Sequence, residues 1–192
     1  MTPEVVQSTA YSSSFPASSV LILYEEDAKM ANGKYNYWAG EKGKTIGQGF
    51  TLRLDERNCK RLIAGFQIKP MGKGVNRWGA TKEFRVSGSK NENGPWQTFV
   101  EGHLNDTMGK AAPLLNFNFE EPAEIQFIKF DLVSFWGAGG AIQYFAAVPE
   151  FPAIPVTGIS PMTALQGRQL GCKLWLPLAN AKAHIAKTPP PP

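Results

Sequence analysis

The stretch from Phe117 to Val148 limits the possible folds most strongly, because three apolar runs follow one another in it with clear breaks between them. In residues 115–120 apolar and polar residues alternate, which is the period of a strand with one buried face. Residues 125–130 are apolar and aromatic over too short a run for a helix, and predict a strand buried on both faces. Residues 142–148 alternate again. A proline turn and a glycine-rich loop separate the runs, so the stretch predicts three antiparallel strands that are central to the fold.

Further strand patterns precede this stretch. Residues 50–54 and 62–68 each place apolar side chains at alternate positions, as half-buried strands do. Residues 83–87 and 96–100 show the same pattern on either side of Asn93-Gly94-Pro95, a strong turn signal. The second pair therefore predicts a β-hairpin.

The fold class and the domain boundary follow from these patterns. About eight strands and no long amphipathic helix within residues 1–148 predict an all-β antiparallel sandwich or jelly roll. Residues 20–24 are a short apolar run that fits either a strand or a single turn. Nine of the fifteen prolines lie in residues 149–192. Since proline donates no hydrogen bond to a sheet, this segment is predicted to be an irregular, disordered Pro-rich tail or linker.

The distribution of charge argues against nucleic-acid binding. The net charge is +4, but residues after Pro149 carry four basic side chains and one acidic side chain. The body of the chain is therefore left with only +1. A nearly neutral body is a poor electrostatic match to a phosphate backbone, so no nucleic-acid partner is expected.

Cysteines and hydrophobic segments say little about the compartment. Cys59 and Cys172 lie far apart, and two free thiols are expected in preference to one bridge, with no zinc spacing. We expect neither a signal peptide at the N-terminus nor a transmembrane segment, because no run approaches about 20 apolar residues. Asn105-Asp106-Thr107 is a glycosylation sequon, which has meaning only in a secretory setting. The localisation therefore stays unknown from these features.

Several motifs, taken together and in order along the chain, match the pattern of one known family. They are FTLRL at 50–54, LIAGFQI at 62–68, TKEFRVSGS at 81–89 followed by Asn93-Gly94 and Trp96, and FIKF at 127–130 followed by Ser134-Phe135-Trp136. On these motifs residues 5–148 resemble the discoidin domains, the coagulation factor V/VIII type C modules of the galactose-binding-like superfamily. The resemblance implies a discoidin-like sandwich that meets its ligands with loops at one end, and it favours an extracellular location.

The chain departs from that family in two places that concern cofactors and crosslinks. The family usually ties its ends with a disulfide, but no cysteine lies near Val5 or Val148. Where some members carry an Asn-x-x-Asp that helps to hold calcium, this chain has Ser18-Ser19-Val20-Leu21. No cofactor is therefore expected, and calcium has no support in the sequence.

Catalytic groups are sparse, so an enzyme is not expected. His103 and Glu101 could form an acid/base pair, but a solvated histidine is the simpler interpretation because catalysis needs a constellation of groups. His184 lies in the predicted tail. Residues 137–140 follow a strand but lack the lysine and the helix of a phosphate-binding loop.

A binding site fits the sequence better. On the family pattern, the ligand-binding loops fall at residues 12–16 and 71–78, with Phe15, Asn76, Arg77 and Trp78 as the candidate site residues. Phe15 is expected to project between small polar residues. An amide, a bidentate donor and a flat ring suit a sugar, whose hydroxyls need partners while its C–H face stacks on an aromatic ring. The same set suits a protein hot spot, so glycan recognition and a protein-interaction or cell-adhesion role both stay open.

The other tryptophans bear on the same question. Trp78 either meets a ligand or packs under its own loop. Trp136 is expected to be structural, and Trp38 and Trp96 are assigned to the core.

Overall fold

The structure is a computed structural model of all 192 residues, and it describes residues 3–24, 30–54, 62–72, 79–107 and 110–150. These residues all belong to one unit, Thr2–Val156. The prediction of a tail over residues 149–192 falls outside the described residues from position 151 onward and stays a prediction.

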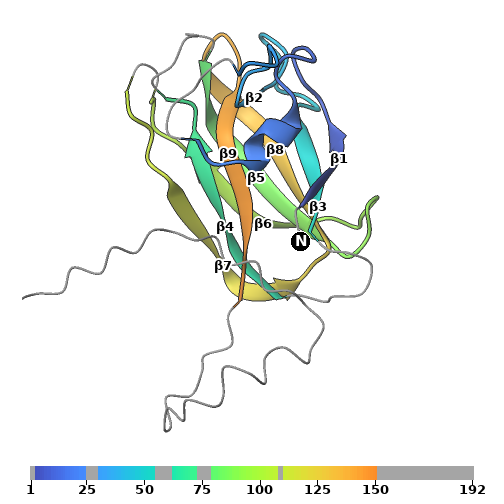
Figure 1. The fold of residues 1–192 in the computed structure, drawn as a ribbon. Coiled ribbons are helices and arrows are strands. Elements are labelled where there is room, and N and C mark those ends of the chain that lie inside the picture. Colours follow the sequence, from blue (N-terminus) through green and yellow to red (C-terminus); the bar gives the residue numbers. More distant parts are fainter. Residues whose placement is uncertain (1–2, 25–29, 55–61, 73–78, 108–109, 151–192) are drawn as a thin grey trace, which may run out of the picture. The chain divides into compact units, whose positions relative to one another are not determined.

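Nine strands and one short 3₁₀ helix make up the described part of the chain (Figure 1). In chain order they are β1 Glu4–Ser8, η1 Ala17–Leu21, β2 Trp38–Ala39, β3 Gly49–Arg53, β4 Leu62–Pro70, β5 Gly79–Ser89, β6 Gln97–His103, β7 Leu115–Glu124, β8 Phe127–Gly137 and β9 Ala141–Pro149. The prediction of an all-β antiparallel sandwich is confirmed, with one strand more than the eight expected. The apolar run at residues 20–24 is not a strand, because its first part completes the helix η1.

The strands form two antiparallel sheets. One has five strands in the order β1-β3-β8-β5-β6, and the other has four in the order β2-β9-β4-β7. The predicted hairpin is present as β5 and β6, with Val86 opposite Val100. Pro149 still pairs with Ile63 at the end of β9, so the strand runs one residue past the predicted boundary.

The three strands predicted to be central do not pair with one another in sequence order. β8 lies in the middle of the five-stranded sheet, whereas β7 and β9 belong to the other sheet and flank β4 there. The chain crosses from one sheet to the other at residues 125–126 and again at residues 138–140. The predicted proline turn is wrong, because β7 runs through Pro122 to Glu124, as an edge strand can. β8 and β9 are interior strands, but β7 is an edge.

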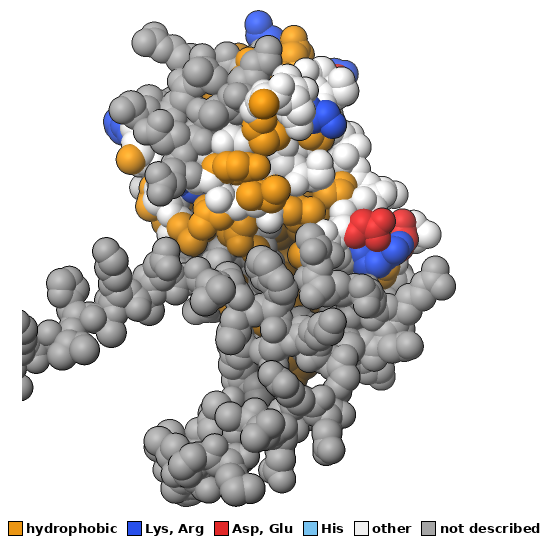
Figure 2. All heavy atoms as spheres, in the orientation of Figure 1, with side chains coloured by type: hydrophobic (Ala, Val, Ile, Leu, Met, Phe, Trp, Pro, Cys, Tyr) orange, Lys and Arg blue, Asp and Glu red, His pale blue; other side chains and the backbone are white. Residues whose placement is uncertain are grey.

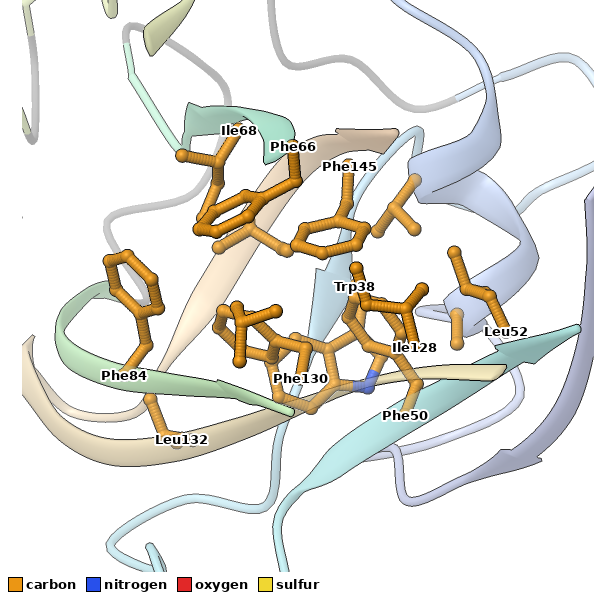
Figure 3. Close-up of a cluster of buried hydrophobic side chains, with 14 of the residues drawn as sticks. Trp38, Phe50, Leu52, Phe66, Ile68, Phe84, Ile128, Phe130, Leu132 and Phe145 are labelled. Carbon is orange, nitrogen blue, oxygen red and sulfur yellow. The ribbon is translucent and has the colours of Figure 1, made fainter. Parts of the chain in front are cut away.

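Aromatic rings from both sheets fill the space between them (Figure 3). Phe50 stacks on Phe130 with centroids 5.2 Å apart, and Phe66 stacks on Phe145 at the same distance. Trp38 is fully buried and meets Phe130 edge-on, so its assignment to the core is confirmed. Offset and edge-on rings add stability beyond the area that they bury. This rigid core positions the loops at both ends of the sandwich.

The assignment of Trp96 to the core is wrong. The side chain is only half-buried, because it follows the turn that joins β5 and β6 at one end of the sandwich. Trp136 is structural as predicted: it lies in β8, and its Nε1 donates a hydrogen bond of 3.0 Å to the Leu104 carbonyl oxygen.

Candidate binding surface at the loop end of the sandwich

The end of the sandwich where β1 and β4 finish and β5 and β9 begin carries the first loop predicted to bind ligand and the two flanks of the second (the upper end in Figure 1). A second hydrophobic cluster, separate from the main core, lies beneath them. We call it the loop-end cluster. Its buried members are Phe15, Tyr37, Ala39, Met71, Ala80 and Ala141, and Tyr35 packs against them partly exposed.

The loop-end cluster joins the two predicted loops. Phe15 comes from the loop 12–16, while Met71 and Ala80 flank residues 73–78 on either side. These segments lie more than 50 residues apart in the sequence. The structure thus brings the first loop and both flanks of the second onto one packed base.

The prediction that Phe15 projects from its loop is wrong. Its side chain is only 8% exposed, and its ring stacks on Tyr35 with centroids 4.6 Å apart and contacts Tyr37 at 5.4 Å. Packing against two flat rings removes more of the apolar surface of Phe15 from water than projection among polar loop residues would. Phe15 therefore positions the loop, and a direct contact with ligand stays a prediction.

Backbone hydrogen bonds fix the first loop against the segment that carries Tyr35. The Tyr35 amide donates to the Ser14 carbonyl oxygen at 2.7 Å. The Ser19 hydroxyl, itself buried, donates to the Tyr35 carbonyl oxygen at 2.8 Å. These hydrogen bonds satisfy the polar groups of the loop and so hold the loop against the segment that carries Tyr35.

The flanks of the second loop are held just as closely. The buried Thr107 hydroxyl donates to the Met71 carbonyl oxygen at 2.6 Å. On the other flank, a Cβ added to Gly79 would lie 2.1 Å from the Gly139 carbonyl oxygen, so only glycine fits there. Asn76, Arg77 and Trp78 lie between these anchors, at positions outside the described residues, and their roles stay predictions.

Tyr11 is the aromatic side chain at this end that sequence reasoning missed. It directly precedes the first loop, is 47% exposed, and its ring lies 5.8 Å from the Phe15 ring. The signal was present as an aromatic residue directly before three serines. An exposed ring beside serine hydroxyls offers both stacking and hydrogen bonding to a ligand.

The described residues contain no group of side chains suited to hold a metal ion. Within them no group of three or more His, Cys, Asp or Glu side chains could hold an ion. At the segment that aligns with the calcium motif of the resembled family, Ser19 is committed to Tyr35 and Val20 is fully buried. Without a carboxylate, these residues do not fit calcium, which prefers charged oxygen ligands.

The possible acid/base pair is also engaged elsewhere. Glu101 accepts a hydrogen bond of 2.8 Å from Arg85 Nε, while the ring of His103 lies edge-on to Trp136 at 6.2 Å. Near the loop end, a hydrogen bond from Lys44 lowers the pKa of the exposed Glu41 carboxyl. The contacts of Glu101, His103 and Glu41 are those of a solvated surface, and none of them places a nucleophile beside a base.

Comparison with known proteins bears on the fold. No protein-family model matches this sequence, and no curated protein matches it. Solved structures do match. The family 32 carbohydrate-binding module from C. perfringens NanJ in complex with galactose superposes with a TM-score of 0.57 and 16% identity, over 76% of this chain and 92% of that one. The chain has the discoidin-like, galactose-binding-like fold.

Two further structures show how widely this fold is used. The Clostridium perfringens module CpGH89CBM32-5 in complex with GalNAc-β-1,3-galactose has a TM-score of 0.55 and 13% identity, over 76% of this chain and 93% of that one. Allantoicase also matches the discoidin-like sandwich, with a TM-score of 0.55 and 8% identity, over 78% of this chain and 41% of that one. Both binding modules and an enzyme thus share the fold, which by itself does not fix the function.

No helix in the described ranges is long and apolar enough to cross a membrane.

Proposed function

We propose that this protein is a non-enzymatic glycan-binding module that recognises its ligand with the loops above the loop-end cluster. One observation carries the proposal: Phe15 of the first loop packs in the same buried cluster as Met71 and Ala80, which flank the second. A preformed base of this kind lowers the entropy that binding must overcome. The fold supports the proposal, since solved structures that share it include modules in complex with galactose and with GalNAc-β-1,3-galactose.

In this proposal Trp78 and Tyr11 provide the stacking faces, and Asn76, Arg77 and the serines of the first loop bond to sugar hydroxyls. The proposal includes no metal, since the segment that aligns with the calcium motif of the resembled family, Ser18-Ser19-Val20-Leu21, carries no carboxylate. Sugars are held by a few well-placed polar groups around a flat apolar contact. In the proposal the aromatic rings supply the flat contact, and the amide, guanidinium and hydroxyl groups supply the polar contacts.

A glycan array with the full-length protein, run with calcium and with a chelator, tests the proposal. Selective hits are expected in both lanes, including terminal galactose. Trp78→Ala and Tyr11→Ala should each abolish or strongly weaken these hits while the melting temperature stays nearly unchanged. Collapse of the fold in Trp78→Ala would instead place that ring in the packing. Loss of the hits in the chelator lane alone would contradict metal-free binding.

A protein-interaction or adhesion role is the second candidate, and a specific observation favours it. Ile22 and Leu23, directly after η1, are 54% and 49% exposed. Figure 2 shows hydrophobic side chains gathered in a band over η1 and β9. Exposed apolar bands of this kind often mark protein contacts. A blank glycan array with folded protein, together with a partner lost in an Ile22→Ser/Leu23→Ser variant, would establish this role instead.

A further inference from the structure

A groove lies at the end of the sandwich opposite the loop end. It has a volume of about 450 Å³ and runs between the connection of β5 to β6 and the turn from β7 to β8 (the lower end in Figure 1). β5 spans the whole distance from Gly79 at the loop end to Ser89 in the groove. At about 3.3 Å per residue its ends are roughly 33 Å apart, so the groove is separate from the loop-end surface.

The floor of the groove is apolar and closely packed. Ile125 is 5% exposed, and Phe99 stacks on Phe119 with centroids 4.4 Å apart. A Cβ added to Gly88 would lie 2.6 Å from the Phe99 ring and 2.7 Å from Ile125, so the backbone of β5 lies directly against this floor. Such a floor is preformed and does not have to order when a ligand arrives.

Trp96 forms an amphipathic wall of the groove. The side chain is half-buried, and the Lys129 ammonium lies 5.9 Å from its ring centroid. The turn before it packs close, since a Cβ added to Gly94 would lie 2.9 Å from the indole. In the described residues no hydrogen-bond acceptor meets the indole N–H. A half-buried tryptophan whose indole N–H meets no acceptor offers a ligand a flat apolar face and one hydrogen-bond donor.

The rim of the groove carries polar groups but no net charge. Lys90 and Glu124 form an ion pair of 3.0 Å, which cancels their charges. The Lys129 ammonium beside Trp96 is likewise paired with Asp131 at 3.0 Å. Asn91 and Gln97 are exposed, and neither side-chain amide has a partner among the residues that the structure describes. Two free amides beside an indole match hydroxyl groups, which both donate and accept. A charged ligand would gain little here.

We propose that this groove is a second saccharide-binding site, which takes one neutral pyranose. The C–H face of the sugar stacks on Trp96, and its hydroxyls bond to the side chains of Asn91 and Gln97. The proposal does not depend on glycan binding at the loop end, because different residues carry it. If both surfaces bind, one module can hold two sugars about 30 Å apart, and a multivalent glycan gains avidity without any new contact.

The test uses the full-length protein on an array of neutral glycans that includes galactose and GalNAc-β-1,3-galactose. Trp96→Ala removes the stacking face, and Asn91→Ala/Gln97→Ala removes the amides but keeps the ring. Both should weaken binding of a common subset of glycans by at least about tenfold, the effect of losing one binding hot spot. Asn118→Ala is the matched control, since it removes an exposed amide of β7 that does not line the groove.

The outcomes separate the two proposed sites. Loss of glycans in both groove variants with Trp78→Ala unaffected supports the groove and overturns the loop-end site. Wild-type affinity for every glycan in both groove variants overturns the groove, whatever Trp78→Ala does. Capture of a proline-rich peptide at Trp96 with no glycan bound by the wild type also overturns it, because the groove would then recognise a peptide.

Discussion

The rings of Phe15 and Tyr35 stack face to face, with centroids 4.6 Å apart and planes only 3° from parallel. The two residues lie 20 positions apart in the sequence, with η1 between them. Their contact holds both residues in the loop-end cluster. The first candidate binding loop therefore depends on packing rather than on its own turn geometry.

Phe15→Ala should destabilise the protein strongly. Removing a buried phenylalanine ring from a packed cluster costs about 3–5 kcal/mol. Chemical denaturation of the full-length protein measures this, and Phe15→Leu should lose clearly less. A loss below about 1 kcal/mol in Phe15→Ala would mean that the ring is not held in the cluster.

Thr107→Val should loosen the second loop. The substitution keeps the shape of the side chain but removes the donor to the Met71 carbonyl oxygen, which is then left buried without a partner. The expected cost is about 1–3 kcal/mol. Glycan binding at the loop end should weaken as well. Thr107→Ser keeps the hydroxyl and serves as the control, and equal effects of the two changes would contradict the role of this bond.

Gly79→Ala should be far more damaging than Gly33→Ala. Both glycines have positive φ, +154° and +80°, but a Cβ at Gly33 meets nothing within 4 Å. Only the local conformational cost of about 1–2 kcal/mol is therefore expected for Gly33→Ala. At Gly79 the Cβ would overlap the Gly139 carbonyl oxygen at 2.1 Å, so thermal unfolding should show a much larger loss. Similar melting temperatures for the two variants would rule out this close approach.

Gln143→Met should stabilise the protein. Gln143 is fully buried, and neither its side-chain nitrogen nor its side-chain oxygen has a hydrogen-bond partner in the described part of the chain. Replacing an unsatisfied amide by an apolar side chain of similar volume removes a penalty of about 1–3 kcal/mol. Equilibrium denaturation measures the gain. A loss of stability would instead indicate an ordered water bound to the amide.

Tyr144→Phe should reduce the fall in the free energy of unfolding with rising pH in the alkaline range. Burial raises the pKa of the Tyr144 hydroxyl above its ordinary value of 10.0. As pH rises through that value the unfolded chain loses this proton first, so the free energy of unfolding falls until the folded-state pKa is passed. Between about pH 9 and about pH 11 the variant should therefore lose less stability than the wild type. Parallel curves would show that other groups control this limb.

Local pattern was enough to find most of the strands. The alternation at 50–54, 62–68 and 115–120 predicted strands because period-2 burial is a property of the strand itself. The hairpin of β5 and β6 was also predictable, since Asn93-Gly94-Pro95 specifies a turn without help from the rest of the chain. The fold class followed from the number of such strands and from the family resemblance.

The sequence by itself determined the all-β class and the positions of most strands, but it predicted three central strands of which only β8 and β9 are interior. The assignment of consecutive strands to alternate sheets was decided only by tertiary structure, because alternation marks a buried face but not the sheet that it faces. Burial of Phe15 was decided in the same way: Tyr35 and Tyr37 reach its ring only after the chain has turned through η1. The packing of Phe15 together with Met71 and Ala80, which flank the second candidate loop, and the half-exposure of Trp96 in its groove likewise depend on contacts between distant segments. No local pattern encodes such contacts.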